Sequence, residues 1–204
     1  MDYQATLFAP DLADGLSLAS AERMYLGDGA WVDVARGFLP ASDEVFDTLV
    51  NRVPWRADRR PMYDRVVEVP RLVHTYRDGR QLPHTVLVDA FHELNSHYEA
   101  ELGEQFVTAS VSLYRNGHDS VAWHGDRIGR SRTQDTMVAV LSIGDTRRLS
   151  FRPRGGGASI GIDLGSGDLA VMGGSCQRTW EHAVLKVAHA GPRISVQFRP
   201  AGVF

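Results

Sequence analysis

The stretch Val121-Ala-Trp-His-Gly-Asp126 contains two of the three residues on which the interpretation of this chain depends. Its residues alternate as in a β-strand, where side chains two positions apart point to the same face. His124 and Asp126 therefore project together. A second histidine, His182, lies in Thr179-Trp-Glu-His-Ala-Val-Leu185, which has the same strand-like pattern. A neighbouring strand could thus bring His182 beside the pair.

Two imidazoles and one carboxylate on one face match the facial triad of non-haem iron(II) oxygenases, which leaves further coordination positions open. A His-x-Asp pair also arises often by chance. Taken alone, the pair is better explained by a strand that carries an exposed histidine and a solvated aspartate. The metal-site hypothesis therefore depends on a further pattern that follows the second histidine.

That further pattern is the stretch Arg193-Ile-Ser-Val-Gln-Phe-Arg199. Its strict alternation places Arg193, Ser195 and Arg199 on one face and the apolar residues on the other. Arginines on an inward face need anions, because unpaired buried charge is costly. The co-substrate 2-oxoglutarate would supply carboxylates, one of which can accept a bidentate guanidinium pair. An amphipathic edge strand with solvated arginines is the alternative.

The composition is that of an ordinary soluble globular protein. The chain has 204 residues, of which 43% are hydrophobic, and we predict a single domain over residues 1–204. No apolar run approaches the roughly 18 residues of a membrane span, and no secretory signal is visible at the N-terminus. With Cys176 as the single cysteine, no internal disulfide can form, which fits a reducing cytosol. We predict a cytoplasmic monomer in which Cys176 is packed rather than nucleophilic.

Arginines are concentrated in two segments that flank the His-x-Asp pair in sequence, although the net charge is −3. Residues 52–80 carry eight arginines and four acids, and residues 127–154 carry seven arginines and two acids. Such segments suit a polyanionic partner such as nucleic acid. The alternative is a pair of solvated loops in an arginine-rich protein.

The chain is predicted to form two helices followed by a series of strands. Residues Ser42–Val53 predict a helix with Ser42 as its N-cap, and residues 87–102 predict a second helix that ends at Gly103. Residues 1–30 have the pattern of a loop with short turns. The predicted strands are Phe106–Tyr114, Val121–Asp126, Thr136–Ile143, Leu149–Arg152, Ala158–Leu164, Asp168–Met172, His182–Val187 and Arg193–Arg199. This order predicts a mainly β fold, a double-stranded β-helix (jelly roll) with the N-terminal helices packed on one outer face.

The stretch from Pro70 to Pro200 resembles the AlkB family of iron(II)- and 2-oxoglutarate-dependent nucleic-acid dealkylases. Several short motifs carry the resemblance in the order and spacing of the family. They are Val69-Pro-Arg71 with Tyr76-Arg-Asp78, Tyr114-Arg-Asn-Gly117, His124-Gly-Asp126, Arg148-Leu-Ser-Phe-Arg152, Gly167–Gly174 with Gln177 and Trp180-Glu-His182, and Pro192-Arg193 with Arg199.

The resemblance implies a role for each matching residue of the centre. His124, Asp126 and His182 would bind iron(II) and carry catalysis, with 2-oxoglutarate as co-substrate and O2 as oxidant. Tyr114 would hydrogen-bond the co-substrate, and Arg193 would pair with its far carboxylate.

Arg199 would lie nearer the metal and steer Asp126, the substrate or the other carboxylate of the co-substrate. Two positions depart from the family, because Ser112 and Ser195 stand where the family commonly has Asn. Both would still contact the co-substrate, through a shorter side chain. The family also commonly has a second acid soon after the metal-binding Asp126, whereas here the next acid is Asp135.

The resemblance also implies a nucleotide-recognition lid within an N-terminal extension at about residues 1–83. Arg71 and Tyr76 would belong to this lid, and Arg127 and Arg130 would contact the substrate, as phosphate-binding arginines. Further aromatic residues are candidates for stacking on a base or lining the pocket, namely Trp55, Tyr63 and Trp180.

The implied activity is oxidative removal of alkyl groups from bases of DNA or RNA, with release of formaldehyde and succinate, as in DNA repair. A 2-oxoglutarate-dependent hydroxylase of a protein side chain or small molecule is the alternative. A non-catalytic binding module is less consistent with an intact triad and arginine pair. The sequence leaves open DNA against RNA, single against double strands, and methyl against etheno adducts.

Overall fold

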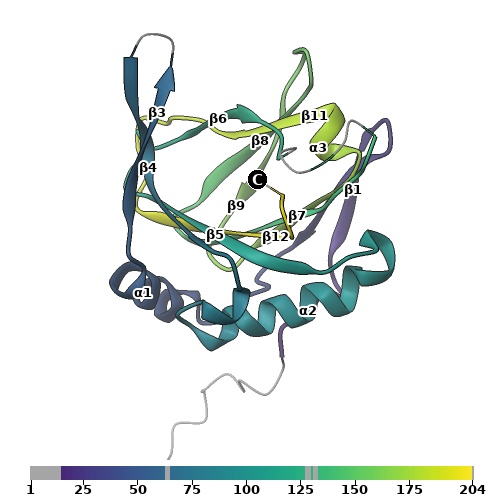
Figure 1. Cartoon of the computed structure of the whole chain (residues 1–204), viewed down its shortest axis with the longest axis horizontal. Coiled ribbons are helices and arrows are strands. Elements are labelled where there is room, and N and C mark those ends of the chain that lie inside the picture. Colours follow the sequence, from purple (N-terminus) through teal and green to yellow (C-terminus); the bar gives the residue numbers. More distant parts are fainter. Residues whose placement is uncertain (1–14, 63–64, 127–129, 131–132, 204) are drawn as a thin grey trace, which may run out of the picture.

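Two antiparallel sheets lie face to face, and two helices run along the outer side of the larger sheet (Figure 1). The computed structural model describes residues 15–62, 65–126, 130 and 133–203. Within these residues the larger sheet has the strand order β1-β2-β10-β7-β12-β5-β4-β3, and the smaller has the order β6-β11-β8-β9. This confirms the predicted jelly roll.

The strand bounds follow this division. The larger sheet contains β1 (Glu22–Gly27), β2 (Ala30–Ala35), β3 (Arg56–Met62), β4 (Arg65–Tyr76), β5 (Phe106–Tyr114), β7 (Val138–Gly144), β10 (Leu169–Gly174) and β12 (Arg193–Pro200). The smaller sheet contains β6 (Val121–His124), β8 (Arg147–Pro153), β9 (Ile160–Leu164) and β11 (Trp180–Val184).

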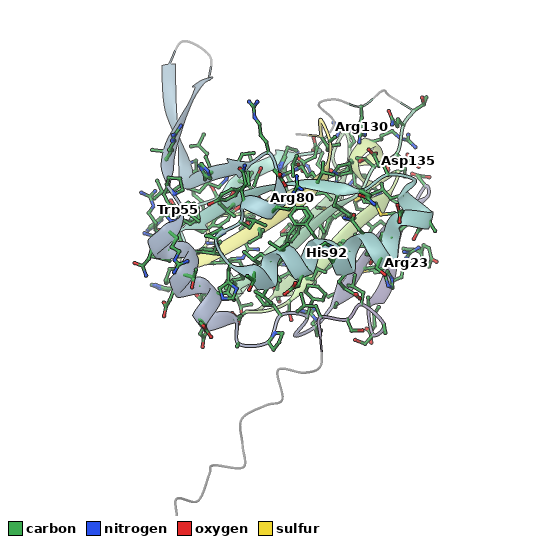
Figure 2. All side chains as sticks on the ribbon, turned by 60° about the horizontal axis from the view of Figure 1, so that its bottom comes forward. Arg23, Trp55, Arg80, His92, Arg130 and Asp135 are labelled. Carbon is green, nitrogen blue, oxygen red and sulfur yellow. The ribbon has the colours of Figure 1, made fainter. Side chains whose placement is uncertain are left out.

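The two long helices are α1 (Ser42–Arg52), which packs against β7, and α2 (Thr85–Leu102), which packs against β5. Each buries an apolar stripe and leaves polar residues such as His92 outside (Figure 2). They lie on one outer face, as predicted. A short helix, α3 (Cys176–Thr179), precedes β11, and a 3-10 turn, η1 (Gly79–Gln81), precedes α2.

The helix ends agree with the prediction at one end and differ at another. Gly103 ends α2 with φ 73°, a conformation that favours glycine. Ser42 is the first residue of α1 rather than its N-cap, so that prediction is wrong. The cap is Ala41 at φ 49°, because the Ser42 hydroxyl bonds to that of Ser166 instead.

Residues 1–30 were predicted as loop, and this is wrong for β1 and the start of β2, while residues 1–14 lie outside the described part. β1 is an edge strand with mostly exposed residues, so it lacks the apolar alternation that identifies half-buried strands. Its Arg23 binds Asp33 of β2 and Glu101 of α2. Tyr98 of α2 also donates to Asp33. These polar contacts add to the pairing of β1 with β2, which itself pairs with β10.

The larger sheet separates two environments, which places the functional residues. On its outer side, Ile194, Val196 and Phe198 of β12 are buried in the apolar core beneath the helices. On its inner side, Arg193 and Ser195 face the space between the two sheets. The alternation predicted for this strand therefore sorts apolar residues to the helices and polar residues to the interior.

No helix in the described part of the chain is long and apolar enough to cross a membrane.

Candidate metal centre and co-substrate pocket

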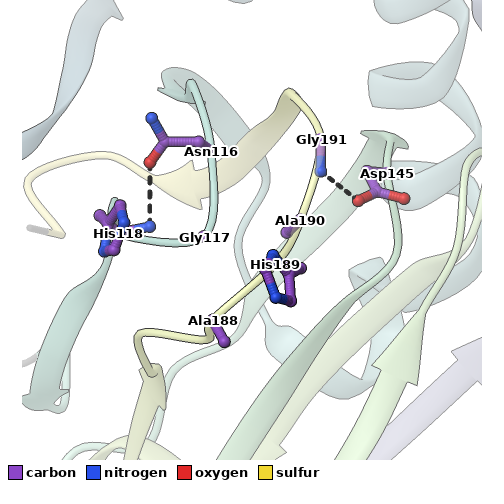
Figure 3. A pocket seen from close by; sticks show the side chains of 8 residues that line it. All are labelled: Asn116, Gly117, His118, Asp145, Ala188, His189, Ala190 and Gly191. Carbon is purple, nitrogen blue, oxygen red and sulfur yellow. Dashed lines mark hydrogen bonds between the residues drawn. The ribbon is translucent and has the colours of Figure 1, made fainter.

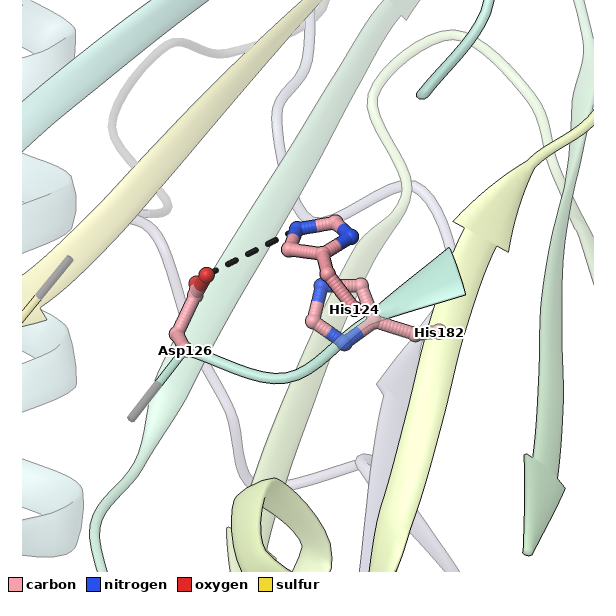
Figure 4. Close-up of side chains that lie close together, drawn as sticks. All are labelled: His124, Asp126 and His182. Carbon is pink, nitrogen blue, oxygen red and sulfur yellow. Dashed lines mark ion pairs between the residues drawn. The ribbon is translucent and has the colours of Figure 1, made fainter. Parts of the chain in front are cut away.

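Neighbouring strands of the smaller sheet bring the three predicted metal ligands together. β6 pairs antiparallel with β11, and His124 and His182 are direct partners in this ladder. Their ring centroids are 4.2 Å apart, and Asp126 follows directly after the end of β6. One ligand atom from each residue lies within 4.8 Å of the others (Figure 4). Such a group fits the facial triad of an iron(II) site.

The hydrogen bond of His124 determines which of its nitrogens is available to a metal. Its Nδ1 lies 2.8 Å from the carbonyl oxygen of Ala122. A carbonyl can only accept, so Nδ1 carries the proton and Nε2 keeps a lone pair. Nε2 is the nitrogen that faces Asp126, 3.6 Å from Oδ1. A metal-binding histidine held through its other nitrogen is the usual arrangement.

Asp126 is a buried carboxylate whose two oxygens face different partners. Arg199 donates from Nε to Oδ2 at 2.9 Å and forms an ion pair with the same oxygen through Nη2, also at 2.9 Å, while Oδ1 faces His124. Burial alone would raise the pKa of Asp126, but the positive charge of Arg199 and its hydrogen bond lower it below its ordinary value. The group is therefore ionised at neutral pH, as metal binding requires.

His182 is buried as a neutral imidazole. Burial, with repulsion from His124, lowers the pKa of His182 to about 3. A neutral ring can donate its lone pair to a metal without first losing a proton.

Arg193 lies at the inner wall of the larger sheet with only 1% of its surface exposed. Its Nε donates to the hydroxyl of Ser142 at 2.8 Å, and its Cζ lies 5.2 Å from the ring centroid of Tyr114. Its Nη1 is buried with no hydrogen-bond partner in the described part of the chain. Burial and the nearby charge of Arg147 lower the pKa of Arg193, although Tyr114 opposes the shift, so an anion beside the guanidinium would stabilise its charge. A carboxylate of 2-oxoglutarate fits that need.

Arg147 is a second buried guanidinium at this pocket that the sequence interpretation missed. It is 2% exposed, and its Cζ lies 5.6 Å from the Tyr114 ring. It donates to three carbonyl oxygens, those of Asn116, Asp119 and Leu185. The alternation of β8 points Arg147 inward with Leu149 and Phe151, and this was the signal that could have identified it.

Ser112 and Ser195, the two residues that depart from the family pattern, lie side by side on the inner face of the larger sheet. Ser195 of β12 is the register partner of Ser112 on β5, and both are buried. Gln197, two residues further along the same face, donates from Nε2 to the hydroxyl and the carbonyl oxygen of Ser195. The side chain that contacts Ser195 therefore comes from Gln197 on the same strand, β12.

The predicted substrate residues are not all brought to the metal. Arg71 lies near the inner side and donates to the carbonyl of Ser120 at 3.2 Å. Tyr76 lies in the core beneath the helices, because it shares the face of β4 that pairs with Ala109. Arg130 is 8% exposed at its side chain and bound to Glu104 at 2.6 Å.

The remaining candidates are placed as follows. Arg127 and Tyr63 lie outside the described residues. Trp55 packs against the core on the helix side, and Trp180 packs against the residues between the two sheets, near Tyr114.

Cys176 is buried on α3, where burial raises the pKa of its thiol to about 12. It has no thiolate at neutral pH and is a packed residue, as predicted.

A separate hollow of about 650 Å³ lies where the loops after β5 and before β12 meet. It contains none of the triad residues, and its lining includes His118, His189 and Asp145 (Figure 3). Both histidines are exposed.

Comparison with known proteins agrees with this geometry. Residues 34–199 match the 2OG-Fe(II) oxygenase superfamily. The chain is 32% identical over 181 residues to alpha-ketoglutarate-dependent dioxygenase alkB homolog 3 of Bos taurus, and 30% identical over 204 residues to the Homo sapiens protein of that name. These alignments cover 79% and 90% of this chain, and 62% and 68% of the two relatives.

Among solved structures, that of OsALKBH1 is similar in fold, with a TM-score of 0.57 at 14% identity. The alignment covers 88% of this chain and 100% of that one.

The chain therefore belongs to the 2OG-Fe(II) oxygenase superfamily, whose members use iron(II), 2-oxoglutarate and O2. Within that superfamily it belongs to the AlkB family.

Proposed function

We propose that this chain is an iron(II)- and 2-oxoglutarate-dependent dioxygenase that removes alkyl groups from nitrogen atoms of DNA or RNA bases. One observation carries the proposal. A His-Asp-His group whose ligand atoms lie within 4.8 Å shares the inter-sheet space with a buried arginine whose Nη1 has no partner in the described structure. Membership of the AlkB family supports a nucleic-acid substrate.

Each inner-wall residue has a task in this proposal. When bound, iron(II) with 2-oxoglutarate and O2 supplies an oxidation that inert C–H bonds of an alkyl group require, with release of formaldehyde and succinate. His124, Asp126 and His182 would hold the metal. Arg193, with Tyr114 beside it, would hold the far carboxylate of 2-oxoglutarate. The bond from Arg199 keeps Asp126 ionised and leaves its other oxygen directed towards His124.

The substrate base would have to reach the space between the sheets. A base inside a duplex cannot do so without being flipped, so a flipped or single-stranded base is the expected substrate. The β3–β4 hairpin, within the N-terminal extension at about residues 1–83, would form the lid over the bound nucleotide. We further propose a single-domain, monomeric and cytoplasmic protein.

Several arginines of the basic segment 127–154 lie close to acids. In the segment 127–154, Arg130 binds Glu104, Arg148 lies 3.6 Å from Asp163 and Arg152 binds Glu181. The ion pairs of this segment reduce the charge that it offers to a phosphate backbone. The proposal therefore assigns phosphate contacts first to Arg56 of the other segment, which is exposed at the start of β3.

The test is turnover on defined alkylated oligonucleotides, single- and double-stranded, as DNA and as RNA. The protein is incubated with iron(II), 2-oxoglutarate and ascorbate, and repaired base, formaldehyde and succinate are measured. We expect equal amounts of the three products, and none with Asp126→Ala, which removes a metal ligand. Full activity of Asp126→Ala would contradict the metal assignment.

Hydroxylation of a protein side chain or small molecule is the second candidate, and the internal pairing of arginines in residues 127–154 favours it. It would take precedence if the protein bound 2-oxoglutarate and metal but neither bound nor modified any oligonucleotide.

A further inference from the structure

Gln177, on the short helix α3, contacts the metal ligand Asp126 although it lies far from it in sequence. Its side chain is buried, with 2% of the residue exposed. Its Oε1 accepts a hydrogen bond from the backbone N–H of Asp126 at 2.9 Å. The other end of the amide faces Met172, where Nε2 lies 3.6 Å from the sulfur. Because an N–H can only donate, this contact fixes which end of the amide faces Asp126.

The backbone of Asp126 needs this partner because the strand ladder has ended. The last register pair between β6 and β11 is His124 with His182. Asp126 lies beyond it and is buried, so its N–H would otherwise have neither a strand partner nor water. Gln177 therefore replaces the missing strand at this position.

Helix α3 is itself anchored, so it can serve as a fixed support. Ser175, at its start, donates through its hydroxyl to the carbonyl of Asp28 at 2.6 Å and through its N–H to that of Gly29 at 3.3 Å. Through Ser175, these bonds connect α3, and with it the amide of Gln177, to the β1–β2 turn of the larger sheet. Asp126, by contrast, lies in the segment that follows β6, a strand of the smaller sheet. The Gln177 contact therefore links the two sheets beside the proposed metal centre.

A second observation shows how closely the ligand segment lies against α3. A Cβ atom at Gly125, between the two ligands, would come within 2.6 Å of the Gln177 carbonyl oxygen and 3.3 Å of that of Trp180. Both neighbours are backbone atoms that cannot move aside cheaply. Glycine at this position permits the close approach that the Gln177–Asp126 bond requires.

We propose that Gln177 is a positioning residue for the metal ligand Asp126, acting through the backbone N–H of that residue. The direction of a carboxylate follows from its backbone, and here one oxygen must reach Arg199 while the other faces His124. Loss of the Gln177 bond frees the backbone at Asp126 and lets the carboxylate leave the triad. The inference rests on the proposed assignment of His124, Asp126 and His182 as metal ligands.

The test uses cobalt(II) as the probe, added to the metal-free full-length protein and followed by its visible absorption. Gln177→Met keeps the length of the side chain but removes the strong acceptor. Outer contacts of this kind typically change metal affinity by about tenfold to a hundredfold, and we expect a weakening in that range. Gln177→Glu keeps an acceptor oxygen at the same reach, so it should bind cobalt(II) more tightly than Gln177→Met.

Met172→Leu is the matched control, because it changes the other neighbour of the Gln177 amide and leaves the Asp126 contact in place. Melting temperatures of the metal-free variants separate the proposed role from a general loss of stability. We expect both Gln177→Met and Met172→Leu to lower the melting temperature, and only Gln177→Met to weaken cobalt(II) binding.

Wild-type cobalt(II) affinity in a folded Gln177→Met protein would overturn the inference. If that variant does not fold, Gln177→Asn, whose acceptor is one carbon shorter, takes its place. Equal cobalt(II) affinity in Gln177→Asn and Gln177→Glu would then overturn it. Asp126→Ala is measured in parallel, and undiminished binding by that variant would show that the metal assignment, rather than the role of Gln177, has failed.

Discussion

At the scale of single residues, two buried arginines in the described part of the interior differ in how fully they are hydrogen-bonded. Arg147 is as deeply buried as Arg193, but it donates to three carbonyl oxygens. Arg193 donates to Ser142 and also interacts with Tyr114, but its Nη1 has no hydrogen-bond partner in the described structure. An unsatisfied buried guanidinium is costly. This difference supports the proposal that Arg193, rather than Arg147, binds a carboxylate of 2-oxoglutarate.

We predict that Arg193→Lys weakens binding of 2-oxoglutarate by about tenfold or more, in line with the roughly 1.5–3 kcal/mol of a charged hydrogen bond. Lysine keeps the positive charge but lacks the planar fork that binds a carboxylate at two points. Calorimetric titration of the manganese(II)-loaded protein measures the affinity directly.

Arg80→Lys is the matched control, since Arg80 is exposed on η1 and pairs with Asp78. It should leave 2-oxoglutarate binding unchanged. An Arg193→Lys protein with wild-type affinity would argue against the carboxylate site.

Some residues of the candidate site could be predicted from the sequence, and the reason is the period of a strand. In a strand, side chains two positions apart share a face. The sequence alone could therefore group His124 with Asp126, and Arg193 with Arg199. Gln177 was not, because its partner is a backbone group, and sequence patterns carry no signal for such contacts.

The assignment of Tyr76 to the substrate lid comes from the family resemblance, and the strand pattern alone could not test it. Alternation along β4 shows that Tyr76 shares a face with its second neighbours, but it does not say which face points to the interior. The pairing of Tyr76 with Ala109 in the sheet decides this and places it on the helix side. Register of this kind depends on a strand far away in the chain.

At the scale of elements, the close contact between the end of β6 and α3 shapes the metal centre. We predict that Gly125→Ala destabilises the protein by about 1–3 kcal/mol, as overpacking typically does, and also weakens cobalt(II) binding. The added Cβ would lie only 2.6 Å from the Gln177 carbonyl oxygen. The segment that carries His124 and Asp126 would therefore have to move away from α3.

Gly15→Ala serves as the control for this substitution, because a Cβ there meets nothing within 4 Å. Chemical unfolding and cobalt(II) titration are measured on both variants. Unchanged stability and metal affinity in Gly125→Ala would mean that the segment can move away from α3 at no cost.

The loop between β9 and β10 supplies a prediction on pH. Asp168 accepts from the backbone N–H groups of Gly37 and Gly165 and pairs with Arg36 at 2.6 Å. Burial would raise the pKa of Asp168, but these hydrogen bonds and the arginine lower it below its ordinary 3.8. As pH falls through 3.8, the unfolded chain therefore takes up a proton before the folded one does, and stability is lost.

We expect Asp168→Asn to lower the free energy of unfolding at pH 7 and to flatten its fall between about pH 5 and pH 3. Urea unfolding at a series of pH values measures both effects. Asp163→Asn, at an exposed carboxylate 3.6 Å from Arg148, is the control and should change the curve little. If the free energy of unfolding of Asp168→Asn fell with pH in parallel to that of the unmodified protein, Asp168 would not be the source of the pH dependence.

At the scale of the whole molecule, the order of strands from residue 106 onward could be predicted, whereas the two N-terminal hairpins could not. β1 and β3 are rich in charged residues and lie at the two edges of the larger sheet. Edge strands commonly carry charge, because it prevents association with other chains. The same charge hides their strand character from an analysis of apolar alternation.

The distribution of charge over the molecule leads to the last prediction. Arg148 and Arg152 of β8 both lie close to acids, whereas Arg56, at the start of β3, is exposed on the hairpin of the proposed lid. If the hairpin contacts the phosphate backbone, Arg56→Ala should weaken binding to all sequences alike. It should also reduce the slope of log affinity against log salt by about one unit.

Arg148→Ala is the control and should change neither the affinity nor this slope, because its charge is opposed by Asp163. Fluorescence anisotropy of a labelled oligonucleotide over a range of salt concentrations measures both. If Arg148→Ala changed the slope and Arg56→Ala did not, the nucleic acid would lie over the smaller sheet instead of the hairpin. If neither variant changed it, the hydroxylase of a protein or small molecule would become the better description.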